Sequence, residues 1–128
     1  LFFLQRTVTD ILLRTQLEAW QEHYGEDIFK VVFCVGSRWA NVHWGVKTRG
    51  KSGEEYAAPP VPDGFNTLKH AEQGWVNEAA VQKHGFPPAT DTRVLVCGLP
   101  GVYDKLCGTR ESTEVEPYSI LHKLGYTK

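Results

Sequence analysis

The sequence has 128 residues, a length typical of one compact domain. Fourteen Lys and Arg residues against fifteen Asp and Glu residues give a formal charge of -1, which argues against nucleic acid or an anionic membrane as the partner. The longest uninterrupted apolar run, Val31–Val35, is far shorter than the roughly 18 residues that a transmembrane helix needs. Three cysteines without a CxxC pair favour a reduced intracellular chain over a disulfide framework and predict no metal site.

The first segments predict a strand followed by a helix. Leu1–Leu4 is apolar and begins abruptly, which favours the second half of a buried strand in a longer protein over a signal peptide. Thr7 lies three residues before Asp10, a capping arrangement that predicts a helix start. Apolar residues then recur at helical spacing before a stop at Gly25, namely Leu13, Leu17, Trp20 and Tyr24.

The next segment predicts a strand that is covered on both faces. Ile28–Val35 is rich in β-branched and aromatic residues and hardly alternates, as strands of parallel sheets do. Residues 36–74 have no convincing period. Their glycines, prolines and mixed charges predict a long insertion or flexible loop over about 39–72.

Strands and helices alternate again in the last part of the chain. Trp75–His84 is predicted to be a helix with Asn77 as a candidate cap, and Arg93–Cys97 a short strand. Two further helices are expected over Val102–Cys107 and Tyr118–Leu124. This order predicts an α/β fold with a parallel sheet and helices on both faces.

Ligands of such sheets bind at the carboxyl ends of the strands. Two of these ends carry glycine-containing turns, Gly36-Ser37-Arg38 and Cys97-Gly98-Leu99-Pro100. Glycine lets a ligand approach the backbone closely, so both turns are candidate binding segments.

The order of the segments resembles the nicotinamide-nucleotide lobe of the cytochrome b5 reductase group, in the ferredoxin-NADP reductase superfamily. Residues 7–14, 17–18, 73–78, 94–98 and 124–126 carry the resemblance, together with Cys107. It implies that residues 1–128 form a Rossmann-like NAD(P)H-binding domain that is partial, truncated at its N-terminal side. The family's glycine-rich pyrophosphate turn and its FAD domain would lie before Leu1.

The resemblance implies a flavoprotein oxidoreductase that passes hydride from NADH or NADPH to FAD, and then electrons to a one-electron acceptor. Cytochrome b5 or another heme protein would be that acceptor. An upstream domain of the same polypeptide would hold FAD, so the isolated chain is expected to be inactive. The expected location is intracellular, either cytoplasmic or facing the cytoplasm from an organelle membrane.

The resemblance also implies which residues form the site. Cys97, as the catalytic residue, and Gly98 would lie beside the nicotinamide and position it. Trp75 would lie near the adenine. The full set of expected cofactor contacts is Gln5, Arg6, Gly36, Ser37, Arg38, Trp75, Cys97, Gly98, Leu99, Pro100 and Val102, with no metal ligand.

The choice between the two pyridine nucleotides depends on the end of the second strand. NADH-using members place an acidic residue there for the ribose hydroxyl, and Gly36 takes that position here. Ser37 and Arg38 instead offer a hydroxyl and a guanidinium to a 2'-phosphate. The sequence therefore favours NADPH, or use of both cofactors, over strict NADH use.

Simpler interpretations remain open beside these. Taken alone, Cys97 is typical of a small buried residue at a strand end, as Cys34 and Cys107 are expected to be. Ser37 could begin a solvated loop, and Trp75 could anchor a helix in the core. Two other functional classes also remain: a degenerate reductase lobe that acts as a protein-interaction domain without cofactor, and an unrelated flavodoxin-like nucleotide-binding fold.

Overall fold

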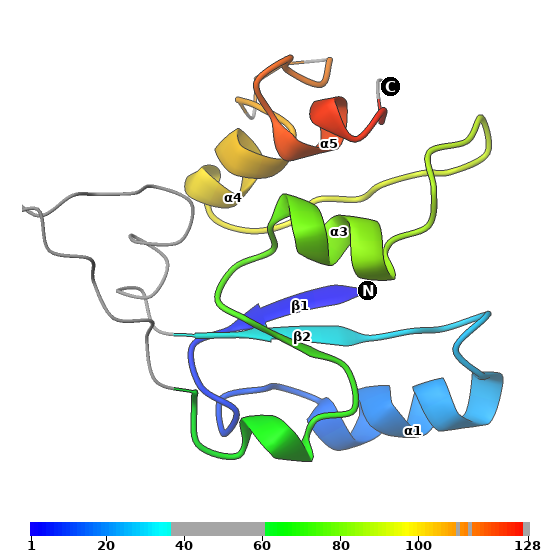
Figure 1. The fold of residues 1–128 in the computed structure, drawn as a ribbon, viewed down its shortest axis with the longest axis vertical. Coiled ribbons are helices and arrows are strands. Elements are labelled where there is room, and N and C mark those ends of the chain that lie inside the picture. The colour runs from blue at the N-terminus through cyan, green and yellow to red at the C-terminus, as the bar shows by residue number, and fades with distance from the viewer. Residues whose placement is uncertain (37–60, 110, 113, 127–128) are drawn as a thin grey trace, which may run out of the picture. The chain divides into compact units, whose positions relative to one another are not determined.

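The computed structural model describes residues 1–36, 61–109, 111–112 and 114–126 (Figure 1). They form two compact units, Leu1–Val76 and Asn77–Lys128. Most of the predicted 39–72 loop lies outside the described residues. Within the described ranges, none of the helices has the length and apolar character needed to cross a membrane.

The first unit is built on a three-stranded sheet. Its strands are β1 (Phe2–Gln5), β2 (Val32–Val35) and β3 (Ala71–Gln73), in the order β1-β2-β3. Both neighbouring pairs are parallel, and the helix α1 (Arg14–Tyr24) connects β1 to β2. The predicted α/β class with a parallel sheet is therefore confirmed.

The α1 helix lies along one face of the sheet (Figure 1), and the core of this unit lies between the two. Leu17 of α1 is 5% exposed and Phe33 of β2 is 1% exposed, and both belong to one apolar cluster. Val32 and Cys34, which point to the other face of β2, are also buried. The prediction of a strand buried on both faces is therefore confirmed.

The α1 helix begins later than the capping signal predicted, at Arg14, seven residues after Thr7. The Thr7 hydroxyl does accept a hydrogen bond from the Asp10 N–H, at 3.3 Å, but the chain then turns and the helix starts at Arg14. The reason is that the intervening Val8 and Ile11 side chains are buried in the core. Leu13 closes this turn in the left-handed region, with φ of 57°.

Replacing Leu13 with glycine is expected to raise the free energy of unfolding by about 0.5–1 kcal/mol. The left-handed backbone conformation costs leucine about 1–2 kcal/mol, a cost that glycine avoids. Glycine offsets part of this gain because its unfolded chain has more conformational freedom to lose on folding. The Leu13 side chain is 63% exposed, so its removal costs little buried apolar surface. Urea denaturation followed by circular dichroism would measure the change. Leu12→Gly is the matched control, because Leu12 is equally exposed but has no positive φ. An equal loss of stability in both variants would contradict the prediction.

The strand predicted over Ile28–Val35 is shorter in the structure. The Gly25 carbonyl accepts hydrogen bonds from the N–H groups of Ile28 and Phe29, at 3.1 and 2.8 Å, which keeps the chain in a turn. Ile28 is 75% exposed as a result. Gly25 itself ends α1 as predicted, and its N–H donates a hydrogen bond to the Gln21 carbonyl.

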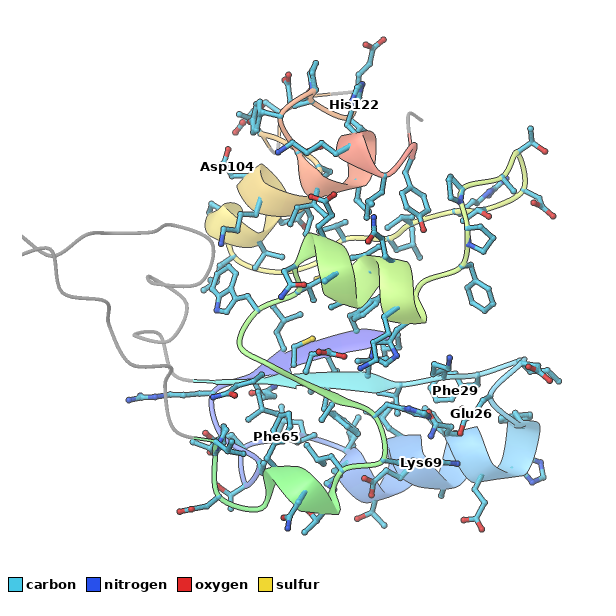
Figure 2. All side chains as sticks on the ribbon, viewed as in Figure 1. Glu26, Phe29, Phe65, Lys69, Asp104 and His122 are labelled. Carbon is cyan, nitrogen blue, oxygen red and sulfur yellow. The ribbon has the colours of Figure 1, made fainter. Side chains whose placement is uncertain are left out.

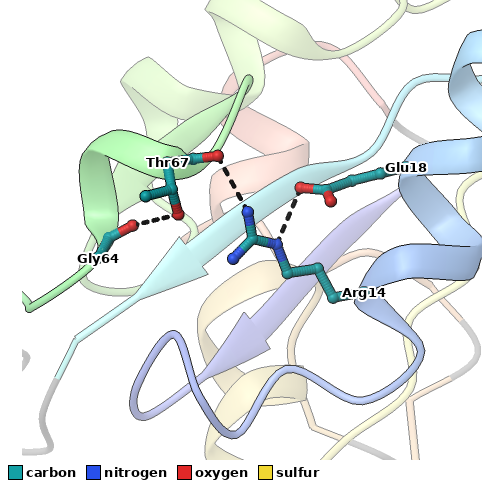
Figure 3. Close-up of polar contacts among 4 residues, drawn as sticks. All are labelled: Arg14, Glu18, Gly64 and Thr67. Atoms are coloured by element: carbon teal, nitrogen blue, oxygen red, sulfur yellow. Dashed lines mark hydrogen bonds and ion pairs between the residues drawn. The ribbon is translucent and has the colours of Figure 1, made fainter.

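The predicted loop over 39–72 is wrong at its end, where the chain forms a 3-10 turn η1 (Phe65–Thr67) and then β3. Arg14 ties this returning segment to α1 (Figure 3). Its guanidinium donates to the Glu18 carboxylate at 3.0 Å and to the Thr67 carbonyl at 2.9 Å. β3 was missed because its three residues, two of them polar, show no strand pattern.

The second unit contains α3 (Glu78–His84), α4 (Pro100–Leu106) and α5 (Ile120–Lys123). The Asn77 side chain caps α3 as predicted, accepting the Ala80 N–H at 2.9 Å. Each of the three predicted helices is thus present, with bounds that differ by a few residues.

The strand predicted over Arg93–Cys97 is wrong, because this segment is in no sheet of the described residues. Its apolar side chains are exposed instead of buried, Leu95 by 95% and Val94 by 45%. A strand requires a pairing partner as well as a suitable composition, and only the composition can be read from the segment itself.

Candidate functional site

The three strands of the first unit end together at one edge of the sheet. Gln5 is opposite Val35, and Val35 is opposite Gln73, so the last residues of the strands are in register. The residues that follow continue this pairing: the Gly36 N–H donates to the Gln5 carbonyl at 3.2 Å, and the Gly74 N–H to the Val35 carbonyl at 2.8 Å. This carboxyl edge is where parallel sheets bind their ligands.

Four of the expected cofactor contacts lie at this edge. Gln5 is half-buried at the end of β1, and Arg6, which follows it, is exposed. Gly36 is buried after β2, and Trp75 is half-buried two residues after β3. Gly74 is not among the expected contacts, although its φ of 88° directs the chain from β3 to Trp75. Ser37 and Arg38 lie outside the described residues.

The turn between β1 and α1 does not fit a dinucleotide pyrophosphate. In dinucleotide-binding sheets such a turn carries glycines, so that backbone N–H groups can reach the phosphates. Here the chain has no glycine before Gly25, and Val8 and Ile11 fold into the core. This turn is therefore not a pyrophosphate-binding turn, in keeping with the expectation that the family's glycine-rich turn lies before Leu1.

The other expected contacts lie together in the second unit. Cys97 is exposed, which excludes the interpretation of a buried packing residue. Gly98 lies directly against Val102, because a Cβ atom on Gly98 would be 3.2 Å from Val102 Cγ2. The Leu99 carbonyl accepts the Val102 N–H at 2.8 Å, and Pro100 starts α4. The five residues therefore lie together where a turn leads into α4: Cys97, Gly98 and Leu99 in the turn, and Pro100 and Val102 in the first turn of the helix.

The remaining cysteines differ from Cys97. Burial, and secondarily the Glu72 carboxylate, raise the pKa of the Cys34 thiol to about 12, so this thiol stays protonated at neutral pH. The prediction that Cys34 is a packing residue is confirmed by its exposure of 1%. Cys107 is half-buried, and burial raises its pKa as well.

A charged cluster before β2 and β3 was not expected from the sequence. The Glu26 carboxylate is 2.7 Å from Lys69 Nζ and 3.0 Å from His70 Nε2, and Figure 2 labels Glu26 and Lys69. Glu26 is more than forty residues from Lys69 and His70 in the sequence, so no local sequence motif predicts the contact. The cluster precedes the strands and therefore lies at the sheet end opposite the carboxyl edge.

The Glu26 cluster is expected to make the protein less stable in acid. Hydrogen bonds from Lys69 and then His70 lower the pKa of Glu26 from 4.5 to about 2. Because the folded-state pKa is the lower one, this stabilisation is complete above pH 4.5 and is lost as the pH falls toward 2. Melting temperatures across this range should fall less steeply for Glu26→Gln than for the parent protein. Asp27→Asn, an exposed neighbour, is the control, and parallel curves for parent and Glu26→Gln would refute the assignment.

The chain is similar in sequence to several known proteins. Over its full length, the chain is 26% identical to NADH-cytochrome b5 reductase 2 from Debaryomyces hansenii and 28% identical to the Saccharomyces cerevisiae protein of that name. The Meyerozyma guilliermondii protein of that name is 37% identical over 59 residues, which cover 44% of this chain and 20% of that protein. No family model matches, and no solved structure gives a significant match.

The chain spans about a third of the length of the first two relatives, 34% in each case. The similarity nevertheless extends from one end of the chain to the other. Together these comparisons support a relationship between this chain and the cytochrome b5 reductase family.

Proposed function

We propose that this chain is the pyridine-nucleotide-binding part of a cytochrome b5 reductase-like flavoprotein oxidoreductase. The observation that carries the proposal is the alignment of Gln5, Gly36 and Gly74 at one sheet edge, beside Trp75. The full-length similarity to two proteins named as NADH-cytochrome b5 reductases supports it.

The chain's own contribution would be binding and orientation. Gly36 and Gly74 carry no side chain at the ends of β2 and β3, and the exposed Arg6 supplies positive charge at the end of β1. Trp75 offers an aromatic surface to the adenine, in keeping with the family resemblance. The exposed Cys97 and Gly98 would hold the nicotinamide in position.

When bound, the reduced nicotinamide supplies a hydride to FAD, which a separate part of the polypeptide would hold. The reduced flavin would then pass electrons singly to cytochrome b5 or another heme acceptor. NADPH, or both cofactors, is favoured by the residues that follow β2, although the relatives are named as NADH enzymes.

Calorimetry of NADPH and NADH binding to the full-length protein would test this function. Removal of the Arg38 guanidinium by Arg38→Ala is expected to weaken NADPH about tenfold or more and to leave NADH unchanged, because only NADPH carries the 2'-phosphate. Arg93→Ala, at an exposed arginine, is the matched control. Equal affinities for both cofactors in the parent and the variant would exclude the 2'-phosphate role of Arg38.

The second candidate function is a protein-interaction domain derived from a reductase lobe that no longer binds cofactor. The exposed apolar side chains of Val94, Leu95 and Leu99 favour it, because exposed apolar residues that lie together are typical of interaction surfaces. If neither NADPH nor NADH binds to the full-length protein, this candidate replaces the first.

A further inference from the structure

The side chains of β3 carry little information about how this strand should pair with β2. β3 has three residues, Ala71–Gln73, two of them polar, and all three are half-buried. Short polar strands specify their register weakly, because a shift by one residue changes little buried apolar surface. The observed register, with Phe33 opposite Ala71 and Val35 opposite Gln73, must therefore be set largely by residues outside β3.

The register of β3 decides what the chain presents at the carboxyl edge. Gly74 follows β3 directly, and its N–H donates to the Val35 carbonyl at 2.8 Å. A shift by one residue would move β3 by about 3.3 Å along β2 and turn its side chains to the opposite face of the sheet. Trp75, the next residue, would then leave its present position at this edge.

The segment that leads into β3 is anchored first by Leu68, which is 8% exposed and belongs to the apolar cluster of the core. Two residues, Lys69 and His70, separate this anchor from β3. The His70 carbonyl accepts the Phe33 N–H at 3.0 Å, which is where the pairing with β2 begins. The positions of these two residues therefore decide the register in which β3 starts.

Glu26 contacts both of these residues from the turn after α1. Its Oε1 atom is 2.7 Å from Lys69 Nζ and its Oε2 atom is 3.0 Å from His70 Nε2, so each carboxylate oxygen has a partner of its own. Glu26 and Lys69 are labelled in Figure 2. The turn that carries Glu26 is itself fixed, because the Gly25 carbonyl accepts the Phe29 N–H at 2.8 Å.

We propose that Glu26 is a positioning residue for the nucleotide site. It sets the register of β3 through Lys69 and His70, and this register places Trp75 at the carboxyl edge. Glu26 lies at the opposite end of the sheet, so it acts through β3 and not on the nucleotide. The consequence for nucleotide binding rests on the proposed function, whereas the register can be measured without a ligand.

Hydrogen exchange at neutral pH on the full-length protein measures the register alone. Glu26→Gln keeps the size of the side chain but removes its charge. The Gly74 amide is then expected to exchange about tenfold faster, because a shifted β3 loses the hydrogen bond to the Val35 carbonyl. The Val31 amide, which is bonded to a side chain of α1, should be unaffected. Asp27→Asn, at an exposed neighbour, is the matched control and should leave the Gly74 amide unchanged.

Calorimetry of NADH and NADPH relates the register to function. Glu26→Gln is expected to weaken both nucleotides by one common factor of at least about fivefold, the lower end of what loss of one base-aromatic contact costs. Gln21→Leu removes a hydrogen bond between α1 and Val31 without changing a residue that contacts β3. It should leave both dissociation constants unchanged, although it lowers the stability of the protein.

The outcomes separate the inference from the proposed function. Unchanged exchange at Gly74 in Glu26→Gln, with normal nucleotide binding, would overturn the inference and leave the proposed function intact. Faster exchange without any change in affinity would refute the positioning role, as would an equal weakening in Gln21→Leu. If the parent protein binds neither NADH nor NADPH, the proposed function fails, and the exchange data still decide whether Glu26 sets the register.

Discussion

Replacing Phe33 with alanine is expected to lower the free energy of unfolding by about 3–5 kcal/mol. Phe33 lies in the middle of β2 with 1% of its surface exposed and packs edge-to-face on Phe3, with ring centroids 6.4 Å apart. Removing the ring leaves a cavity between α1 and the sheet, which the well-packed cluster can close only in part. Chemical denaturation followed by far-UV circular dichroism would measure the loss.

The matched control for this variant is Phe86→Ala. Phe86 is 64% exposed, so the same truncation should change the stability by no more than about 0.5 kcal/mol. A similar loss in the two variants would show that the α1-sheet cluster is not the core of the first unit. Because β2 also aligns Gly36 at the carboxyl edge, Phe33→Ala should weaken the proposed binding of NADPH and NADH as well.

Replacing Gln21 with leucine is expected to lower the free energy of unfolding by about 1–3 kcal/mol, although it introduces an apolar residue into an apolar site. Gln21 is 4% exposed, and its Oε1 accepts a 2.7 Å hydrogen bond from the Val31 N–H. Leucine has a comparable volume but no acceptor, so the backbone N–H would be buried without its partner. This single bond joins the end of α1 to the residue before β2.

Gln16→Leu tests whether the effect belongs to the hydrogen bond. Gln16 is exposed on the same helix, and its replacement should stay within about 0.5 kcal/mol of the parent. Hydrogen exchange should also increase at the Val31 amide of Gln21→Leu before it increases at Phe33. A Gln21→Leu protein as stable as Gln16→Leu would show that the Val31 amide finds another acceptor.

The residues of the candidate site lie in two units of the chain, so each group can be tested by itself. The carboxyl edge gathers Gln5, Arg6, Gly36 and Trp75 in one unit, whereas Cys97 and its neighbours form a separate turn in the other unit. Nucleotide analogues without nicotinamide therefore probe the first group alone. The effect of Cys97 variants would be measured as a change in the rate of hydride transfer, because the proposed role of Cys97 is to position the ring that gives up the hydride.

The elements that the sequence by itself determined are those whose causes lie within a few residues. Gly25 ends α1 and Asn77 caps α3 because each forms hydrogen bonds with residues three or four positions away. The burial of Val32–Val35 also follows from composition, since continuous β-branched and aromatic residues fit a strand covered on both faces.

The tertiary structure decided everything that depends on distant partners. Ala71–Gln73 is a strand because β2 offers it a pairing edge, whereas the more strand-like Arg93–Cys97 pairs with no described strand. The helix starts at Arg14 instead of directly after Thr7, because Val8 and Ile11 are buried in the core. Strand pairing and core packing join residues that are far apart along the chain, and a local sequence pattern carries no information about whether such a partner exists.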